Sequence, residues 1–135
     1  MESLPARILY AEDDADTREL ITVVLASRNC QVFATESHTE ALRLARAEHF
    51  DLYLIDNWMP GISGVGLCQQ LREFDEHTPI LFYSAAAYDK DIQRALSCGA
   101  QGYLVKPADN DDLEAEVLRL ISDSRSRLTG NTLTA

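Results

Sequence analysis

The stretch LYLIDNWMPG (Leu52–Gly61) places a short apolar run directly before an aspartate and a Pro-Gly turn. Four consecutive apolar residues ahead of a turn are typical of a parallel strand that is covered on both faces. Asp56 then stands at the carboxyl end of that strand. The stretch therefore predicts a buried strand that ends in a carboxylate. The function of that carboxylate depends on the residues that lie around it.

Four more short apolar runs flank this strand at fairly even intervals, and three of them are also continuously apolar. They are Ile8–Ala11, Val32–Ala34, Ile80–Tyr83 and Tyr103–Val105. The segments between and after the runs have the apolar spacing of helices, and Ser63 is a candidate N-cap for one of them, Val65–Phe74. A strand that alternates with a helix five times predicts an α/β fold. We expect a flavodoxin-like, doubly wound, five-stranded parallel sheet in the order 2-1-3-4-5, with five helices.

The composition is that of an ordinary globular domain with an excess of acids. The chain has 135 residues, of which 46% are hydrophobic and 25% are charged, and this length fits one domain. The formal net charge is -10, from 22 acids against 12 bases. Because the phosphates of nucleic acids repel an acidic surface, we expect no direct binding of nucleic acid.

Cysteine spacing and apolar segments bear on the cellular compartment. Three cysteines without CxxC spacing, Cys30, Cys68 and Cys98, predict reduced thiols rather than a disulfide framework or a zinc site. The N-terminal residues lack the apolar segment of a signal peptide, and no stretch of 18 apolar residues occurs. These features predict a cytoplasmic protein without a membrane span.

The apolar periodicity ends near Ile121, and the Ser/Thr-rich stretch SDSRSRLTGNTLTA follows it. We therefore predict one domain over residues 1–121 and a helix end with a flexible C-terminal tail over residues 122–135. No helix-turn-helix or catalytic module follows Ile121 in the sequence. This predicts either a stand-alone domain or the corresponding part of a larger protein.

A chemically reactive set of side chains follows four of the five predicted strands. In a doubly wound sheet, ligands bind outside the carboxyl ends of the strands, and in the order 2-1-3-4-5 the first and third strands are neighbours. The set consists of Glu12, Asp13 and Asp14 after the first strand, Asp56 after the third, Ser84 after the fourth and Lys106 after the fifth. We expect the acids to converge, with Ser84 and Lys106 approaching from the other side.

Carboxylates that converge in this way suit phosphoryl chemistry with a divalent cation. Hard oxygen ligands in a small open site favour Mg²⁺, and a carboxylate can attack phosphorus to give an acyl phosphate. The phosphoryl oxygens then need a metal, a cation such as Lys106 and a hydroxyl such as Ser84. Each residue also has a plainer interpretation. The acids after the first strand could simply favour a helix N-terminus, and Asp56 could stabilise the Pro-Gly turn. Ser84 could cap a helix, and Lys106 could be a solvated loop lysine. Their joint occurrence at adjacent strand ends favours the phosphoryl chemistry.

Four sequence segments together resemble a known family. They are ILYAEDD (8–14), LYLIDNWMPGISG (52–64), ILFYSA (80–85) and CGAQGYLVKP (98–107). In this order and spacing the chain resembles, from about Arg7 to Ile121, the receiver (phospho-acceptor) domain of two-component response regulators. The resemblance covers nearly the whole chain, and the four segments in order are highly specific.

The resemblance implies a role for each acid. Asp56 is the implied phospho-acceptor. Mg²⁺ is the implied cofactor, bound directly by Asp13 and Asp56 and by the backbone carbonyl of Trp58, with Glu12 acting through water. Asp14 falls one place beyond the matching pair and receives no metal role.

The resemblance also implies how phosphorylation is read out. Ser84 would hydrogen-bond the phosphoryl group, and Lys106 would pair with it. Tyr103 would be an aromatic switch that turns inward when Ser84 moves toward the phosphate, and a cis peptide bond would precede Pro107. The implied donor is a sensor histidine kinase or phosphotransfer protein. The implied output is a change in the face made by the fourth helix, fifth strand and fifth helix, which would control a downstream protein partner.

Three positions depart from the family pattern. Glu12 replaces the commoner aspartate, which keeps the charge and lengthens the reach. Asn57 is polar where the family usually has an apolar residue. Trp58 is bulky beside the expected phosphate entrance, which puts a typical dephosphorylation rate in doubt.

The histidines give no sign of a site. They are His38, His49 and His77, and they share no spacing. We predict that all three lie on the surface, away from the strand-end cluster, and that none accepts a phosphoryl group.

Two other functions compete with a signalling switch. A Mg²⁺-dependent phosphohydrolase would also work through an aspartyl phosphate, but such enzymes commonly carry a second acid two residues after the nucleophile, where this chain has Trp58. A flavodoxin-like carrier of FMN would need a phosphate cradle after the first strand, where the acids of this chain would repel the phosphate. We therefore predict a phosphorylation-controlled switch that is not an enzyme, with the phosphohydrolase as the alternative.

Overall fold

A computed structural model describes residues 4–59 and 61–134, with side chains described as far as residue 127. Over these residues five strands alternate with five helices. The strands are β1 (Ala6–Ala11), β2 (Cys30–Thr35), β3 (Leu52–Ile55), β4 (Ile80–Ser84) and β5 (Gly102–Val105). The helices are α1 (Ala15–Ala26), α2 (His38–Ala47), α3 (Gly64–Arg72), α4 (Asp89–Ser97) and α5 (Asn110–Thr134). All strand pairs are parallel in the order β2-β1-β3-β4-β5, which confirms the predicted fold.

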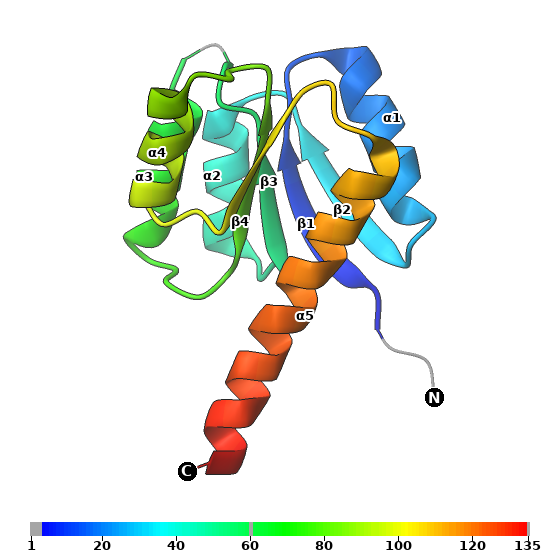
Figure 1. Cartoon of the computed structure of the whole chain (residues 1–135), viewed down its shortest axis with the longest axis vertical. Helices are drawn as coiled ribbons and strands as arrows, with labels where there is room; N and C mark the ends of the chain where they lie inside the picture. The colour runs from blue at the N-terminus through cyan, green and yellow to red at the C-terminus, as the bar shows by residue number, and fades with distance from the viewer. Residues whose placement is uncertain (1–3, 60, 135) are drawn as a thin grey trace.

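Two layers of helices cover the sheet and explain why the strands are continuously apolar (Figure 1). Alternate strand residues such as Tyr53 and Phe82 pack with α2, α3 and α4 in one core cluster. Their neighbours, such as Leu54 and Leu81, pack with α1 and α5 in the other. Both faces of β3 and β4 are thus removed from water, which is the arrangement that parallel strands require.

The strand register aligns the carboxyl ends of β1 and β3. Ala11 in β1 is paired with Ile55 in β3, so the next residue of each strand, Glu12 and Asp56, emerges at the same edge of the sheet. The backbone N–H of Asp56 donates to the carbonyl of Ala11 at 3.1 Å and extends the pairing by one residue. The predicted convergence of the acids follows directly from this register.

Helix α5 continues to Thr134, through most of the segment 122–135 for which a helix end and a flexible tail were predicted. Its last turns project from the domain body (Figure 1). At the start of this extension Arg119 lies 3.1 Å from Asp123, one turn further on, and such i,i+4 pairs add a small stabilisation to a helix. The division into a domain over residues 1–121 and a tail over 122–135 stays a prediction.

Candidate phosphoryl-acceptor site

Three carboxylates meet at the carboxyl edge of the sheet. Glu12, Asp13 and Asp56 each place one carboxylate oxygen within 4.8 Å of the other two. Glu12 and Asp56 are buried, whereas Asp13 is exposed and lies on the solvent side of the cluster. This arrangement brings hard oxygen ligands together with one open side, as a Mg²⁺ site requires.

Lys106 lies between two of these carboxylates. Its Nζ is 2.5 Å from Glu12 Oε1 and 3.2 Å from Asp56 Oδ2. Its backbone N–H donates to the carbonyl of Ser84 at 2.9 Å, and the bond to Pro107 is cis, as the family resemblance implied. The lysine side chain is thus held over the acids by the end of the β4–β5 pairing.

Burial and charge shift the ionisation of Glu12 and Lys106 in a coupled way. Burial raises the pKa of the Glu12 carboxyl above its ordinary value, and Asp56 adds to this while Lys106 opposes it. Burial alone would lower the pKa of Lys106, but the hydrogen bond to Glu12 and the charge of Asp56 together raise it. The folded, metal-free site therefore disfavours the charged form of Glu12 and favours the charged form of Lys106.

The raised pKa of Glu12 leads to a prediction for Glu12→Gln. Because the pKa of Glu12 is raised in the folded protein, the folded state holds that proton more tightly and gains stability as the pH falls toward 4.5. The glutamine variant loses this pH dependence, and we expect its metal-free form to unfold a few degrees higher than the wild type at pH 7. Its Mg²⁺ affinity should fall at the same time. Thermal unfolding with EDTA at several pH values tests this, and a lower midpoint for the variant at pH 7 would contradict it.

Ser84 and Tyr103 are both tied to the same residue of the β4–α4 loop. The Ser84 hydroxyl is fully buried and accepts from the Ala86 N–H at 3.2 Å. The Tyr103 hydroxyl donates to the carbonyl of Ala86 at 2.6 Å. The tyrosine ring stacks on Phe82, with centroids 5.5 Å apart and planes 5° from parallel. The two residues that the resemblance named as the switch are therefore joined through the main chain of one residue, Ala86.

The remaining positions near Asp56 have distinct local roles. Asp14 caps α1 by accepting from the Thr17 N–H at 2.8 Å. The backbone N–H of Trp58 donates to Asp56 Oδ1 at 3.1 Å. The Trp58 indole is 57% exposed. Asp56 therefore makes the local turn bond that a plain turn aspartate would make, in addition to its place in the carboxylate cluster.

The prediction that all three histidines lie on the surface is wrong for His38. His49 and His77 are exposed, but His38 is only 1% exposed, and its Nε2 lies 3.0 Å from the carbonyl oxygen of Asp56. The second strand was the only one whose end lacked an obvious polar group, and His38 follows that strand. Its place there was the available signal, although the sequence did not show which groups it would face.

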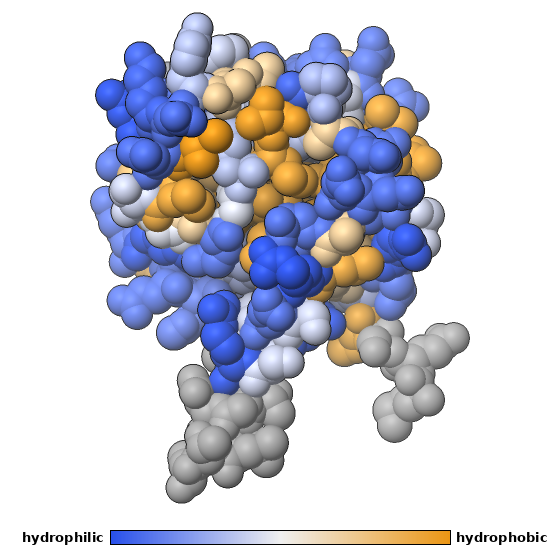
Figure 2. Space-filling model, in the orientation of Figure 1, coloured by the Kyte–Doolittle hydropathy of each residue, from blue (hydrophilic) through white to orange (hydrophobic). Residues whose placement is uncertain are grey.

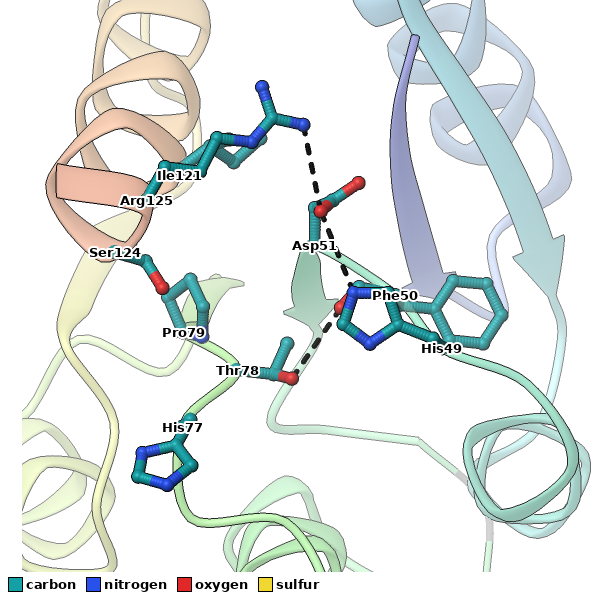
Figure 3. Close-up of a pocket in the computed structure, with 9 residues that line it drawn as sticks. All are labelled: His49, Phe50, Asp51, His77, Thr78, Pro79, Ile121, Ser124 and Arg125. Carbon is teal, nitrogen blue, oxygen red and sulfur yellow. Dashed lines mark hydrogen bonds and ion pairs between the residues drawn. The ribbon is translucent and has the colours of Figure 1, made fainter. Parts of the chain in front are cut away.

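A second pocket lies at the opposite end of the sheet (Figure 3). It is lined by His49, Phe50, Asp51, His77, Thr78, Pro79, Ile121, Ser124 and Arg125. Arg125 lies 3.6 Å from Asp51, and this ion pair links the extension of α5 to the start of β3. Because Asp51 precedes β3 and Asp56 follows it, this pocket takes no part in the carboxylate site.

The donor set at the carboxyl edge fits a divalent cation and a phosphoryl group. Asp13 and Asp56 offer carboxylate oxygens, and Lys106 supplies a cation beside them. A family model for the response regulator receiver domain matches residues 8–118. The chain belongs to the response regulator receiver domain family. The family resemblance drawn from the four sequence segments is thereby confirmed, and the chain is a receiver domain of the two-component signalling class.

Individual relatives support the same assignment. The chain is 33% identical to the DNA-binding response regulator MtrA of Mycobacterium tuberculosis over 117 residues, which are 87% of this receiver domain and 51% of that protein. It is 32% identical to the cell cycle response regulator CtrA of Brucella ovis over 119 residues, 88% of this chain and 51% of the relative. The receiver domain thus spans about half the length of these curated relatives.

Solved receiver domains share the fold. The Francisella response regulator 1452 receiver domain has a TM-score of 0.83 at 27% identity, with 88% of this chain and 98% of that chain covered. The receiver domain of a sensor histidine kinase from Pseudomonas aeruginosa has a TM-score of 0.81 at 26% identity, with 87% and 98% covered, and that structure has a magnesium ion coordinated in its active site cleft. Within the described part of this receiver domain, no helix is long and apolar enough to cross a membrane.

Proposed function

We propose that this receiver domain is a cytoplasmic, phosphorylation-controlled switch that accepts a phosphoryl group on Asp56 from a sensor histidine kinase or phosphotransfer protein. The observation that carries the proposal is the placement of Glu12, Asp13 and Lys106 around the Asp56 carboxylate in a chain of this family. A phosphohydrolase is less well supported, because Trp58 stands where the second acid of such an enzyme would be.

The chemistry assigns a separate task to each side chain. An Asp56 carboxylate oxygen forms the new bond to phosphorus, and the bond from phosphorus to the donor atom breaks with its electron pair leaving on the donor. Lys106 Nζ, already 3.2 Å from Asp56 Oδ2, neutralises phosphoryl oxygens, and the Ser84 hydroxyl offers a further hydrogen bond. Asp56 remains a mixed anhydride until water attacks it.

We propose that Mg²⁺ is the cofactor of this reaction. Asp13, Asp56 and the backbone carbonyl of Trp58 would hold it, with Glu12 acting through water. The ion would neutralise charge that builds up on the phosphoryl oxygens. The fit rests on three carboxylate oxygens within 4.8 Å of one another, a grouping that is costly without a cation.

Acetyl phosphate with Mg²⁺ tests the proposed function without knowledge of the donor protein. We expect the intact mass of the chain to increase by one phosphoryl group, and we expect no increase when EDTA replaces Mg²⁺. The added mass should disappear on brief treatment with hydroxylamine, because acyl phosphates are cleaved by this nucleophile. A chain that stays unmodified at saturating Mg²⁺ would contradict the proposal.

We propose that the output surface is the face made by α4, β5 and α5. Hydrophobic residues gather over β5 on the side seen in Figure 2, and Leu96, Val105 and Leu118 are between 37% and 46% exposed. In α4, the carboxylate oxygen Oδ2 of Asp91 is buried without a hydrogen-bond partner among the described residues. Because an unsatisfied buried oxygen costs about 1–3 kcal/mol, the start of α4 is a suitable element to rearrange.

Hydrogen exchange tests this surface directly. Ser84 and Tyr103 both bond to Ala86, so a phosphoryl group that draws the Ser84 hydroxyl toward Asp56 disturbs the loop before α4. We expect amide exchange to change over residues 85–105 when the protein is phosphorylated. Changes confined to the loop at Asp56 would show that this face does not respond.

A further inference from the structure

His38 joins the start of α2 to both ends of the loop that follows β3. Its ring is buried, with Nε2 3.0 Å from the carbonyl oxygen of Asp56. Its Nδ1 contacts the carbonyl oxygen of Ile62. The two carbonyls bracket the segment 57–61, which contains Trp58. One imidazole ring therefore spans the entry and the exit of the loop that adjoins the acceptor carboxylate.

Both contacts are made to main-chain carbonyl oxygens, which only accept, so a ring nitrogen forms a hydrogen bond there only when it carries a proton. A neutral imidazole carries one N–H and the protonated ring carries two, so at least one N–H···O bond forms in either state. An apolar side chain at this position would leave two carbonyl oxygens facing it without that donor. The contacts therefore require an N–H group and are not explained by filling space.

Hydrogen bonds at the start of α2 hold in place the main chain that carries the ring. Ser37 caps α2 by accepting from the Glu40 N–H at 3.1 Å, which fixes His38 as the first residue of the helix. Thr35 in turn donates through its hydroxyl to the carbonyl of Ser37 at 3.2 Å. These two bonds hold the main chain next to His38 between the end of β2 and the start of α2.

The opposite side of the loop is equally close-packed. The Gly64 N–H donates to the carbonyl of Asn57 at 3.1 Å. A Cβ at Gly64 would lie 2.7 Å from the Asn57 Cα and 2.9 Å from the carbonyl oxygen of Asp56. The two ends of the loop are therefore in close contact with the start of α3 on one side and with His38 on the other.

We propose that His38 is a positioning residue for phosphoryl acceptance, which acts through the main-chain carbonyls of Asp56 and Ile62. The inference rests on the proposed function, because it assigns His38 the task of holding the loop whose carboxylate and Trp58 carbonyl serve that function. Removing the N–H donors frees the loop while leaving all acidic side chains in place. Mutation of a residue that hydrogen-bonds to a metal-binding group typically lowers metal affinity or activity by 10- to 100-fold.

The test compares His38→Leu, which removes the donors at similar volume, with His38→Gln, which restores one amide donor. His77→Ala is the matched control, because His77 is exposed and lies outside the site. Mg²⁺ alone is titrated against the fluorescence of Trp58, the single tryptophan of the chain, whose backbone N–H donates to Asp56 Oδ1. The initial rate of modification by acetyl phosphate and the thermal midpoint are measured on the same samples.

We expect His38→Leu to have about tenfold lower Mg²⁺ affinity and an about tenfold lower rate of phosphoryl uptake than the wild type. His38→Gln should recover most of the affinity and most of the rate. His77→Ala should keep the wild-type affinity and rate. Imidazole added to His38→Ala should partly restore the uptake rate, because the ring then occupies the vacated space. A purely structural role would lower the thermal midpoint and leave Mg²⁺ affinity and uptake unchanged, and that result would overturn the inference. If the wild type binds Mg²⁺ but accepts no phosphoryl group, the proposed function fails, while the Mg²⁺ affinities still decide the role of His38.

Discussion

The Asp56→Asn variant is expected to take up no phosphoryl group from acetyl phosphate, whereas the wild type takes up one. An amide is a far weaker nucleophile than a carboxylate, so the bond to phosphorus does not form. The change keeps the size of the side chain, and the amide oxygen can still accept from the Trp58 N–H, which lies 3.1 Å from Oδ1. Loss of uptake would therefore reflect chemistry and not unfolding, which circular dichroism can confirm.

Asp14→Asn is the matched control for this loss. Asp14 is an acid at the same edge of the sheet, but it is exposed and its carboxylate is used to cap α1. We expect this variant to accept a phosphoryl group at close to the wild-type rate. Uptake that persists in Asp56→Asn, or that disappears in Asp14→Asn, would contradict the assignment of Asp56 as the phospho-acceptor.

Replacing Lys106 by methionine is expected to slow phosphoryl uptake by roughly 10²- to 10³-fold, the range for the loss of one preorganised donor at a developing charge. The Nζ lies 2.5 Å from Glu12 Oε1 and 3.2 Å from Asp56 Oδ2, so the variant also leaves two buried carboxylates without their cation. The metal-free protein should therefore unfold at a lower temperature. Addition of Mg²⁺ should restore stability more than it restores the uptake rate.

Lys90→Met is the control, since Lys90 is the other lysine of the chain and lies in α4, where its Nζ is near the Tyr88 ring. This variant removes the same charge without touching the acids. We expect unchanged uptake from acetyl phosphate. Equal rates in Lys106→Met and the wild type would show that Lys106 is a structural partner of Glu12 and does not act on the phosphoryl group.

The fold was predictable because its determinants are local in sequence. Continuous apolar runs, such as Leu52–Ile55, are required wherever a strand is covered on both faces. The side chains that follow each run must lie at one edge once the strands are parallel. Asp56 and Lys106, which are 50 positions apart, could therefore be placed together before their contact of 3.2 Å was seen.

The contacts of His38 and the C-terminal extent of α5 could not be predicted from sequence patterns. The role of His38 depends on which carbonyl oxygens lie opposite it in space, and a carbonyl is present at every position of the chain. Helix α5 continues to Thr134 although its last turns have no apolar periodicity. The ion pair between Arg119 and Asp123 lies where this continuation begins. Patterns of hydrophobicity detect buried surfaces, so they miss both a main-chain contact and an exposed helix.

The most direct test of the central claim is to locate the phosphoryl bond chemically. Borohydride reduces an aspartyl phosphate to homoserine and leaves free carboxylates and phosphate esters unchanged. After the protein has been treated with acetyl phosphate and Mg²⁺ and then reduced, peptide mass spectrometry should find homoserine at position 56 alone, and none when EDTA is present. A reduced side chain at another acid, whether homoserine at Asp13 or 5-hydroxynorvaline at Glu12, cannot be reconciled with Asp56 as the phospho-acceptor, and neither can a reduction-resistant phosphate on Ser84.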